Sequence, residues 1–437
     1  MASLEAVSLG VAVEEFLGFD DVVIVPGMSP VEPQDVDIHS RVTRTLEVSI
    51  PVVSSPMDTV TEWRMAVLLA RLGSVGVIHR NMSIEDQVDN VARVKSSTPS
   101  PWAEVLKAPW GSDLRGLEYK MEETGVWSAI VVGGRSVRGY YVSERADEPE
   151  TWLSKARDLS RLLSIAKPVP TIDGEGRLAV GAAISPFDLK RALELERAGA
   201  DFLVVDVAHA HNANVLRSLS RMVKSVSVDI VVGNLGTMEG VLDVISRVEE
   251  VAGLRVGISS GSICTTGEVA GVAVPTLTAV INSRGALEEL GLFGKIPIIA
   301  DGGVRGPGDA AKAIIAGAST VMVGRLLAGT YEAPAPIVTV GGSRYKPYRG
   351  MASRGARQRA YSADRYSRPS KVIEEGVEGL VPYRGSAVGV LLELAGGLKA
   401  SLGYSGSASI RDAWRARLAR VMPSTRGEIR PHDIILE

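Results

Sequence analysis

The chain has 437 residues, of which 45% are hydrophobic and 23% charged, and its formal net charge at pH 7 is -3. This composition is typical of a globular protein and argues against a disordered or strongly basic, nucleic-acid-binding chain. No run of about 18 apolar residues is present to span a bilayer, and the N-terminus has no basic start followed by an apolar stretch. Together with a single cysteine, these features predict a cytoplasmic protein that binds neither nucleic acid nor membrane.

Short apolar runs alternate with helical patterns along most of the chain. The runs are Val22–Val25, Pro51–Ser54, Val75–Ile78, Leu178–Ala183, Phe202–Val207, Asp229–Val232, Leu254–Ile258, Pro297–Ala300 and Thr320–Val323. Apolar residues at helical spacing predict helices over Ile84–Val94, Pro186–Ala198, Ala213–Val223, Met238–Val248 and Gly308–Ala316. Runs that are apolar on both faces suit a fully covered parallel sheet, so the pattern predicts a (β/α)8 (TIM) barrel. A doubly wound open sheet is the alternative, but no Gly-x-Gly-x-x-Gly follows a first strand to favour it.

Two segments interrupt this alternation. Residues 96–167 begin with Ser-Ser-Thr-Pro-Ser-Pro and contain a helical pattern over Leu114–Thr124, followed by strand-like runs at Ala129–Val132 and Gly139–Val142. They predict a small α/β unit inserted between two parts of the barrel, 1–95 and 168–437. Residues 331–382 are rich in Gly, Arg, Tyr and Ser and show little periodicity. Long loops of this kind are usually functional or disordered, so we expect a long mobile flap here.

Glycine turns follow the last two predicted barrel strands. Pro297–Ala300 leads into Asp301-Gly302-Gly303, and Thr320–Val323 leads into Gly324-Arg325. Both turns would lie at the C-terminal face of a barrel, where backbone N–H groups often bind phosphate. The alternative is that these glycines serve tight turns only. We predict that the ligand is a phosphorylated small molecule.

The single cysteine, Cys264, lies in the run Gly257-Ile-Ser-Ser-Gly-Ser-Ile-Cys-Thr-Thr266. Glycines and small hydroxyl residues surround it, so the backbone can turn sharply and a ligand can come close. Free cysteines are also among the most buried and inert residues of globular proteins. The spacing alone leaves both interpretations open, a catalytic nucleophile or an inert thiol.

Several motifs together resemble the inosine-5′-monophosphate (IMP) dehydrogenase family, which includes guanosine monophosphate (GMP) reductase. They are Phe19-Asp-Asp-Val-Val-Ile-Val-Pro26, Pro51-Val-Val-Ser-Ser-Pro-Met-Asp-Thr-Val-Thr-Glu62, Gly76-Val-Ile-His-Arg-Asn-Met-Ser83, Ser262-Ile-Cys-Thr-Thr266, Ile299-Ala-Asp-Gly-Gly303, Tyr348-Arg-Gly-Met351, Glu375-Gly-Val-Glu-Gly379 and Gly396-Gly-Leu-Lys399. The resemblance implies a (β/α)8 barrel that assembles as a homotetramer or octamer. Family members often carry a paired cystathionine-β-synthase (CBS) module as an insert, and residues 96–167 are about half as long. We therefore expect one degenerate CBS-like unit.

The resemblance also implies a reaction and the residues that perform it. Cys264, in the loop 257–267, would attack C2 of IMP, and a hydride would pass to the cofactor NAD. Water would then release xanthosine 5′-monophosphate from the covalent adduct. The implied catalytic residues are Cys264, Thr266, Arg365, Tyr366 and Glu375. Arg365 and Tyr366 match the water-activating pair of the family's flap, and Thr266 and Glu375 match an alternative proton relay.

Ligand contacts carry over in the same way. The implied substrate-binding residues are Ser55, Met57, Ser262, Asp301, Gly302, Gly303, Gly324, Arg325, Tyr348, Gly350, Met351 and Glu375. The implied cofactor-binding residues are Asp206, Asn234, Arg255 and Gly257. Carbonyls of Ser259, Gly261 and Cys264 match a potassium (K+) site. The chain reads Ser259-Ser260-Gly261 where the family has Gly-x-Gly, Gly267 where many members have arginine, Thr276 in place of glutamine and Arg325 in place of serine.

Two alternatives to the dehydrogenase stay open. GMP reductase uses the same cysteine, threonine and glutamate with NADPH and has no Arg-Tyr pair, so Arg365-Tyr366 favours the dehydrogenase. The substitutions at Ser259, Gly267 and Arg325 leave room for a paralogue that binds purine nucleotides without turnover. A zinc site at His209 and His211 is not predicted, because no third ligand stands at useful spacing.

Overall fold

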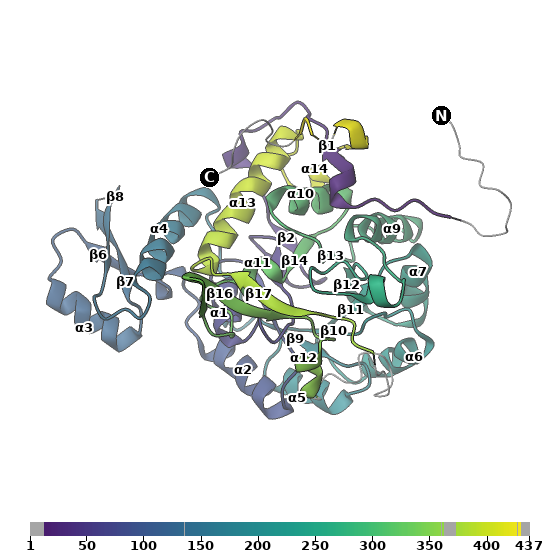
Figure 1. Ribbon diagram of the computed structural model, residues 1–437, viewed down its shortest axis with the longest axis horizontal. Coiled ribbons are helices and arrows are strands. Elements are labelled where there is room, and N and C mark those ends of the chain that lie inside the picture. The colour runs from purple at the N-terminus through teal and green to yellow at the C-terminus, as the bar shows by residue number, and fades with distance from the viewer. Residues whose placement is uncertain (1–12, 135, 360, 362–372, 426, 430–437) are drawn as a thin grey trace.

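The computed structural model describes residues 13–134, 136–359, 361, 373–425 and 427–429. Within this part of the chain, eight parallel strands close into a barrel in the order β10-β11-β12-β13-β14-β4-β5-β9 (Figure 1). Their bounds are β4 Val52–Ser54, β5 Val75–Ile78, β9 Gly181–Ile184, β10 Phe202–Val205, β11 Asp229–Leu235, β12 Val251–Val256, β13 Ile298–Asp301 and β14 Thr320–Val323. The predicted barrel is confirmed, and the open sheet was the wrong alternative.

One of the nine predicted strands does not belong to the barrel. The run at Val22–Val25 forms β1 (Val22–Ile24), which pairs antiparallel with β18 (Leu418–Arg420) in a separate two-stranded sheet. Only Val22 of this strand is fully buried. The run is therefore covered on one side only, which a count of apolar residues does not reveal.

An outer layer of helices surrounds the barrel (Figure 1). Its long members are α1 Trp63–Arg71, α2 Ile84–Ser96, α5 Leu189–Arg197, α6 Ala213–Met222, α7 Met238–Arg247, α9 Thr276–Glu289, α10 Pro307–Ala316 and α13 Ala387–Tyr404. The five predicted helices are confirmed, and several begin at a capping side chain: Ser83 Oγ accepts the Asp86 N–H at 3.0 Å. Helices α9 and α13 escaped prediction because they bury residues on most of their circumference and lack a clear polar face, and α1 because it is short and buries six consecutive residues, Met65–Ala70.

By length and composition alone, one helix in the described part of the chain, α13, is long and apolar enough to cross a membrane. It packs instead against α10 and against α4 (Pro149–Ile165), and it buries Leu391, Leu394 and Leu398. The sequence-based search for an apolar run passed over it because Glu393 and Lys399 interrupt the run. We interpret α13 as a core helix.

Residues 96–167 contain a second, smaller sheet, which lies beside the barrel (Figure 1). Strand β6 (Leu106–Pro109) pairs parallel with β7 (Ser128–Gly133), and β7 pairs antiparallel with β8 (Ser136–Val142). The predicted helix is confirmed as α3 (Leu114–Thr124), whereas β6 and α4 were not predicted. The domain boundaries and the CBS-like character of this unit stay predictions.

The predicted flap, 331–382, is more regular than its sequence suggests. It contains β15 (Val338–Val340), β16 (Ser343–Arg349), α12 (Arg354–Gln358) and β17 (Glu378–Pro382). The three strands form an antiparallel sheet in the order β15-β16-β17. This sheet places the ends of β16 and β17 above the C-terminal side of the barrel strands, close to the cavity described next.

Candidate active site

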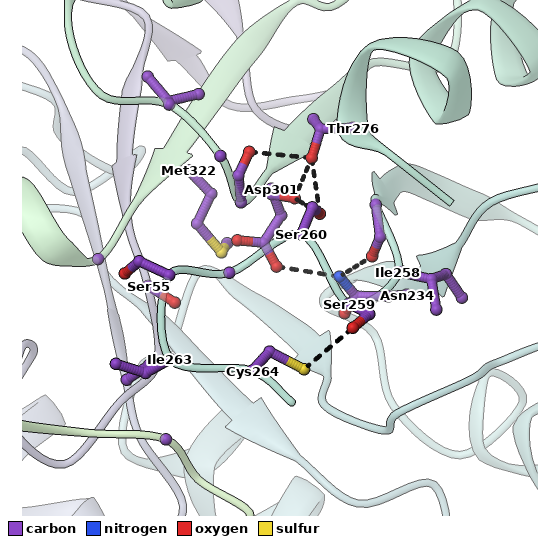
Figure 2. Close-up of a pocket in the computed structure, with 18 of the residues that line it drawn as sticks. Ser55, Asn234, Ile258, Ser259, Ser260, Ile263, Cys264, Thr276, Asp301 and Met322 are labelled. Carbon is purple, nitrogen blue, oxygen red and sulfur yellow. Dashed lines mark hydrogen bonds between the residues drawn. The ribbon is translucent and has the colours of Figure 1, made fainter. Parts of the chain in front are cut away.

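A cavity of about 680 Å³ opens at the C-terminal ends of the barrel strands (Figure 2). Its walls come from the ends of β4, β10, β11, β12, β13 and β14 and the segments that follow them, from residues 18–21 near the N-terminus, and from the flap around residues 348–352 and 375. The predicted site residues that line it are Ser55, Met57, Asp206, Asn234, Arg255, Gly257, Ser259, Gly261, Ser262, Cys264, Thr266, Asp301, Gly302, Gly303, Gly324, Arg325, Tyr348, Gly350, Met351 and Glu375. Arg365 and Tyr366 lie outside the described residues.

The thiol of Cys264 begins a short chain of polar groups. Cys264 is half-buried, and its Sγ lies 3.2 Å from Thr266 Oγ1. Thr266 Oγ1 in turn donates a hydrogen bond to Glu375 Oε2 at 3.1 Å. Glu375 is buried, with 2% of its surface exposed. The arrangement allows a proton to pass from the sulfur through a hydroxyl to a carboxylate.

Backbone pairing brings Glu375 to the cysteine loop. Cys264 and Gly376 form an isolated antiparallel bridge. The Thr265 N–H donates to the Glu375 carbonyl at 3.2 Å, and the Val377 N–H donates to the Ile263 carbonyl at 3.0 Å. The loop after β12 and the segment leading into β17 are therefore held together, although they are far apart in sequence.

Glycines form the turns that follow β13 and β14. Gly302 and Gly303 have φ of 93° and 73°, in the left-handed region. At Gly324 a Cβ atom would lie 3.0 Å from Tyr348 Oη and 3.2 Å from Met57 Sδ, so glycine leaves room for the phenol. Burial raises the pKa of Tyr348 to about 12, so its hydroxyl stays protonated and can donate to an anion.

A buried arginine joins the two acidic residues of the cavity. Arg255 Nε donates to Asp301 Oδ2 at 2.8 Å, and Arg255 Nη1 donates to Asp206 Oδ1 at 3.1 Å. Burial alone would lower the pKa of Arg255, but the two carboxylates raise it above its usual value. Asn234 Nδ2 donates to Asp301 Oδ2 as well, at 2.9 Å. Hydrogen bonds from described residues thus converge on Oδ2, which leaves Asp301 Oδ1 for a ligand.

Two neighbouring contacts were missed by sequence reasoning. Arg80, 2% exposed, places Nε 3.6 Å from Asp206 Oδ2 and donates from Nη2 to the Asp206 carbonyl at 3.0 Å. Arg349, on β16, donates from Nε to Asp58 Oδ1 at 3.0 Å, and Asn81 donates to Asp58 Oδ2 at 2.8 Å. Their position in the sequence could have indicated these contacts, because Asp58, Arg80 and Asn81 lie within the quoted motifs just after β4 and β5.

The residues matched to a potassium site lie in one loop, but they form bonds of their own. The Gly261 carbonyl accepts the Cys264 N–H at 3.1 Å. Ser259 has a left-handed backbone, with φ of 58°, and its hydroxyl accepts the Gly267 N–H at 2.7 Å. A cation cradle needs carbonyls directed at one point. Of the three carbonyls, that of Gly261 already accepts a hydrogen bond within the loop, and the Ser259 hydroxyl holds the loop closed, so these residues fit a cation less well than three free carbonyls would.

Comparisons with known proteins agree with the resemblance. The family model described as "IMP dehydrogenase / GMP reductase domain" matches residues 16–432. The inosine-5′-monophosphate dehydrogenase of Korarchaeum cryptofilum is 41% identical, with 95% of this chain and 96% of that protein covered. The enzyme of the same name from Thermoplasma acidophilum is 43% identical, with 97% and 96% covered.

A solved structure is similar as well. It is GMP reductase C318A from Trypanosoma brucei in complex with guanosine 5′-monophosphate, with a TM-score of 0.75 and 31% identity, covering 98% of this chain and 100% of that one. The family model and the curated relatives both extend over nearly the whole chain. The chain therefore belongs to the IMP dehydrogenase / GMP reductase family of oxidoreductases.

Proposed function

We propose that this protein oxidises IMP to xanthosine 5′-monophosphate and reduces NAD, through a covalent bond between Cys264 and C2 of the purine. This reaction is a step of guanine nucleotide synthesis. The observation that carries the proposal is the contact chain from Cys264 through Thr266 to Glu375, in the same cavity as the glycine turns after β13 and β14. The names of the relatives support the dehydrogenase reaction.

The phosphate, the ribose and the purine of the substrate would each contact a different part of the cavity. Backbone N–H groups at Gly303 and Gly324 and the phenol of Tyr348 suit the phosphate. Asp301 Oδ1 suits the ribose hydroxyls, since Oδ2 is already bound by Arg255 and Asn234. The remaining residues of the predicted substrate set surround the purine and phosphate: Ser55, Met57, Ser262, Gly302, Arg325, Gly350, Met351 and Glu375.

The thiol of Cys264 would lose its proton to Thr266 as the hydroxyl proton of Thr266 passes to Glu375, and the resulting thiolate would add to C2. NAD, when bound beside Asp206, Asn234, Arg255 and Gly257, supplies the acceptor for the hydride that leaves C2. Water then adds to C2 and the carbon–sulfur bond breaks, which returns the free thiol. We assign the activation of this water to Arg365 and Tyr366. No step of the proposal uses a monovalent cation.

The test is NADH formation from IMP and NAD, followed by absorbance. We expect turnover in the native chain and none in Cys264→Ala. The same assay with GMP and NADPH addresses the second candidate, which the similarity to the Trypanosoma brucei reductase motivates. Oxidation of NADPH by GMP, with no reaction of IMP and NAD, would overturn the dehydrogenase proposal in favour of the reductase.

A binding protein without turnover is distinguished by alkylation. Cys264 is the single cysteine, so incorporated label reports on this residue alone. Protection of Cys264 by IMP without turnover of either substrate pair would identify a purine-nucleotide-binding paralogue. For Arg365→Ala, we expect the adduct to accumulate, because hydride transfer proceeds while hydrolysis slows. We also propose a homotetramer or octamer, which light scattering measures.

A further inference from the structure

Ser259 holds a backbone conformation that its side chain disfavours. Its φ of 58° lies in the left-handed region, which glycine adopts freely and a residue with a Cβ adopts only with strain. Among the described residues two further non-glycine positions share a positive φ, Lys167 and Glu250, and neither lines the cavity. Strained residues at a site persist when the surrounding contacts compensate for them. The contacts of the Ser259 side chain should therefore show what compensates for this strain.

The hydroxyl of Ser259 connects three points of the cysteine loop. It accepts the Gly267 N–H at 2.7 Å, in the short helix α8 (Thr266–Val269) that follows Cys264. The thiol of Cys264 donates to the same oxygen, with an S···O distance of 3.7 Å (Figure 2). A glycine at this position would have neither contact. The side chain thus links the end of β12 to the nucleophile and to the helix after it.

Two neighbouring hydroxyls fasten the other side of this loop to the barrel. Thr276 Oγ1 lies 2.8 Å from Ser260 Oγ and 2.8 Å from the Asp301 carbonyl, at the end of β13 (Figure 2). Ser260 Oγ also donates to the Asp301 carbonyl, at 3.2 Å. Three side-chain hydroxyls, from Ser259, Ser260 and Thr276, thus brace one loop.

A bound cation and a hydroxyl brace are two ways to keep such a loop in shape. A cation would gather the carbonyls of Ser259, Gly261 and Cys264. In this loop the Gly261 carbonyl accepts a hydrogen bond from the Cys264 N–H, and the Ser259 hydroxyl contacts both the Cys264 thiol and the Gly267 N–H. We propose that Ser259 is a positioning residue that holds the Cys264 loop in place of a monovalent cation, so that the loop keeps its arrangement without K+.

The test compares the native chain with Ser259→Gly by amide hydrogen exchange over residues 257–269. Exchange is measured in potassium chloride and in tetramethylammonium chloride at equal ionic strength, because the larger cation cannot enter a carbonyl cradle. Glycine suits the left-handed backbone, so the variant folds. Glu250→Gly is the matched control, since it removes a non-glycine residue of positive φ outside the cavity. The measurement needs no substrate, so its outcome is independent of the proposed reaction.

We expect the native chain to exchange at the same rate in both salts. In Ser259→Gly the loop should exchange about fivefold faster in tetramethylammonium, as expected for the loss of one hydrogen bond, and K+ should restore slow exchange. Glu250→Gly should leave the loop unchanged. An equal response of the native chain to K+ would overturn the proposal, and so would a Ser259→Gly loop that is unaltered or that K+ does not restore.

Discussion

A single hydroxyl, that of Thr266, lies between the sulfur of Cys264 and the carboxylate of Glu375. Because it donates to Glu375, it can accept a proton from the thiol at the same time. A methyl group in its place would interrupt this path while filling nearly the same volume. A substitution of Thr266 can therefore test proton transfer without altering the binding of the substrate.

For Thr266→Val we expect the rate of NADH formation to fall by at least about 100-fold, the usual contribution of a positioned proton-transfer group. Protection of Cys264 from alkylation by IMP should persist, because the cavity keeps its shape. Thr266→Ser retains the hydroxyl and serves as the control, with most of the activity preserved. A valine variant as active as the serine variant would rule out a relay through this residue.

Sequence reasoning located single residues of the cavity but not the contacts between them. Cys264, Asp301 and Gly324 were found because each stands in a local motif, and all line one cavity. The contacts of Arg255 join β12 to β13 at Asp301 and to Asp206, the residue after β10, and sequence spacing carries no information about them. The left-handed conformation of Ser259 could not be predicted either, because a serine in the sequence does not indicate a positive φ.

At the scale of elements, the barrel strands were predictable because each is a short, continuous apolar run. Two of them, Val75–Ile78 and Thr320–Val323, were predicted with their exact ends confirmed. Sequence patterns did not show how the side chains of neighbouring strands fill the barrel interior. There, Phe202 of β10 extends toward Gly181 of β9, where a Cβ would lie 2.4 Å from the ring. Large and small residues on paired strands thus share one space.

We expect Gly181→Ala to destabilise the protein by about 1–3 kcal/mol, because the added methyl group forces the ring of Phe202 or the strand to move. Urea unfolding measures the loss. The matched control is Gly139→Ala, in strand β8, where an added Cβ would meet no atom within 4 Å. A loss for Gly181→Ala no larger than that of the control would show that the barrel interior has room to spare.

For the whole molecule, helix α4 connects the small sheet, the barrel and the flap. It packs against β7 and β8 on one side and against α13 on the other (Figure 1). Trp152 of α4 meets the ring of Tyr331 edge-on, with centroids 6.0 Å apart, and Thr151 shares a hydrogen bond of 2.7 Å with Tyr383 just beyond β17. The inserted unit is therefore fastened to the same segment that supplies Tyr348 and Glu375 to the cavity.

A buried ion cluster lies at this junction. Lys155 Nζ of α4 lies 2.5 Å from Glu104 Oε2 and 3.4 Å from Glu332 Oε1. Arg71 of α1 approaches Glu104 from the barrel side, at 2.7 Å. Burial alone would raise the pKa of Glu104, but the charges of Lys155 and Arg71 hold it below its ordinary value. The cluster joins the inserted unit, the barrel and the start of the flap.

We expect Lys155→Met to lower the free energy of unfolding by about 3–5 kcal/mol at neutral pH, because two buried carboxylates lose their shared cation. Lys120→Met, at an exposed position on α3, is the control and should change the free energy of unfolding by less than about 0.5 kcal/mol.

The effect of Lys155→Met should depend on pH. Because the pKa of Glu104 is depressed on folding, the stability that its carboxylate contributes is present above the unfolded pKa, near 4.5, and is lost as the pH falls through the folded pKa. We therefore expect the difference in free energy of unfolding between the native chain and Lys155→Met, measured by urea unfolding, to become smaller as the pH falls below about 4.5. A difference that is constant across the acid range would assign the loss to packing of the lysine stem rather than to its charge.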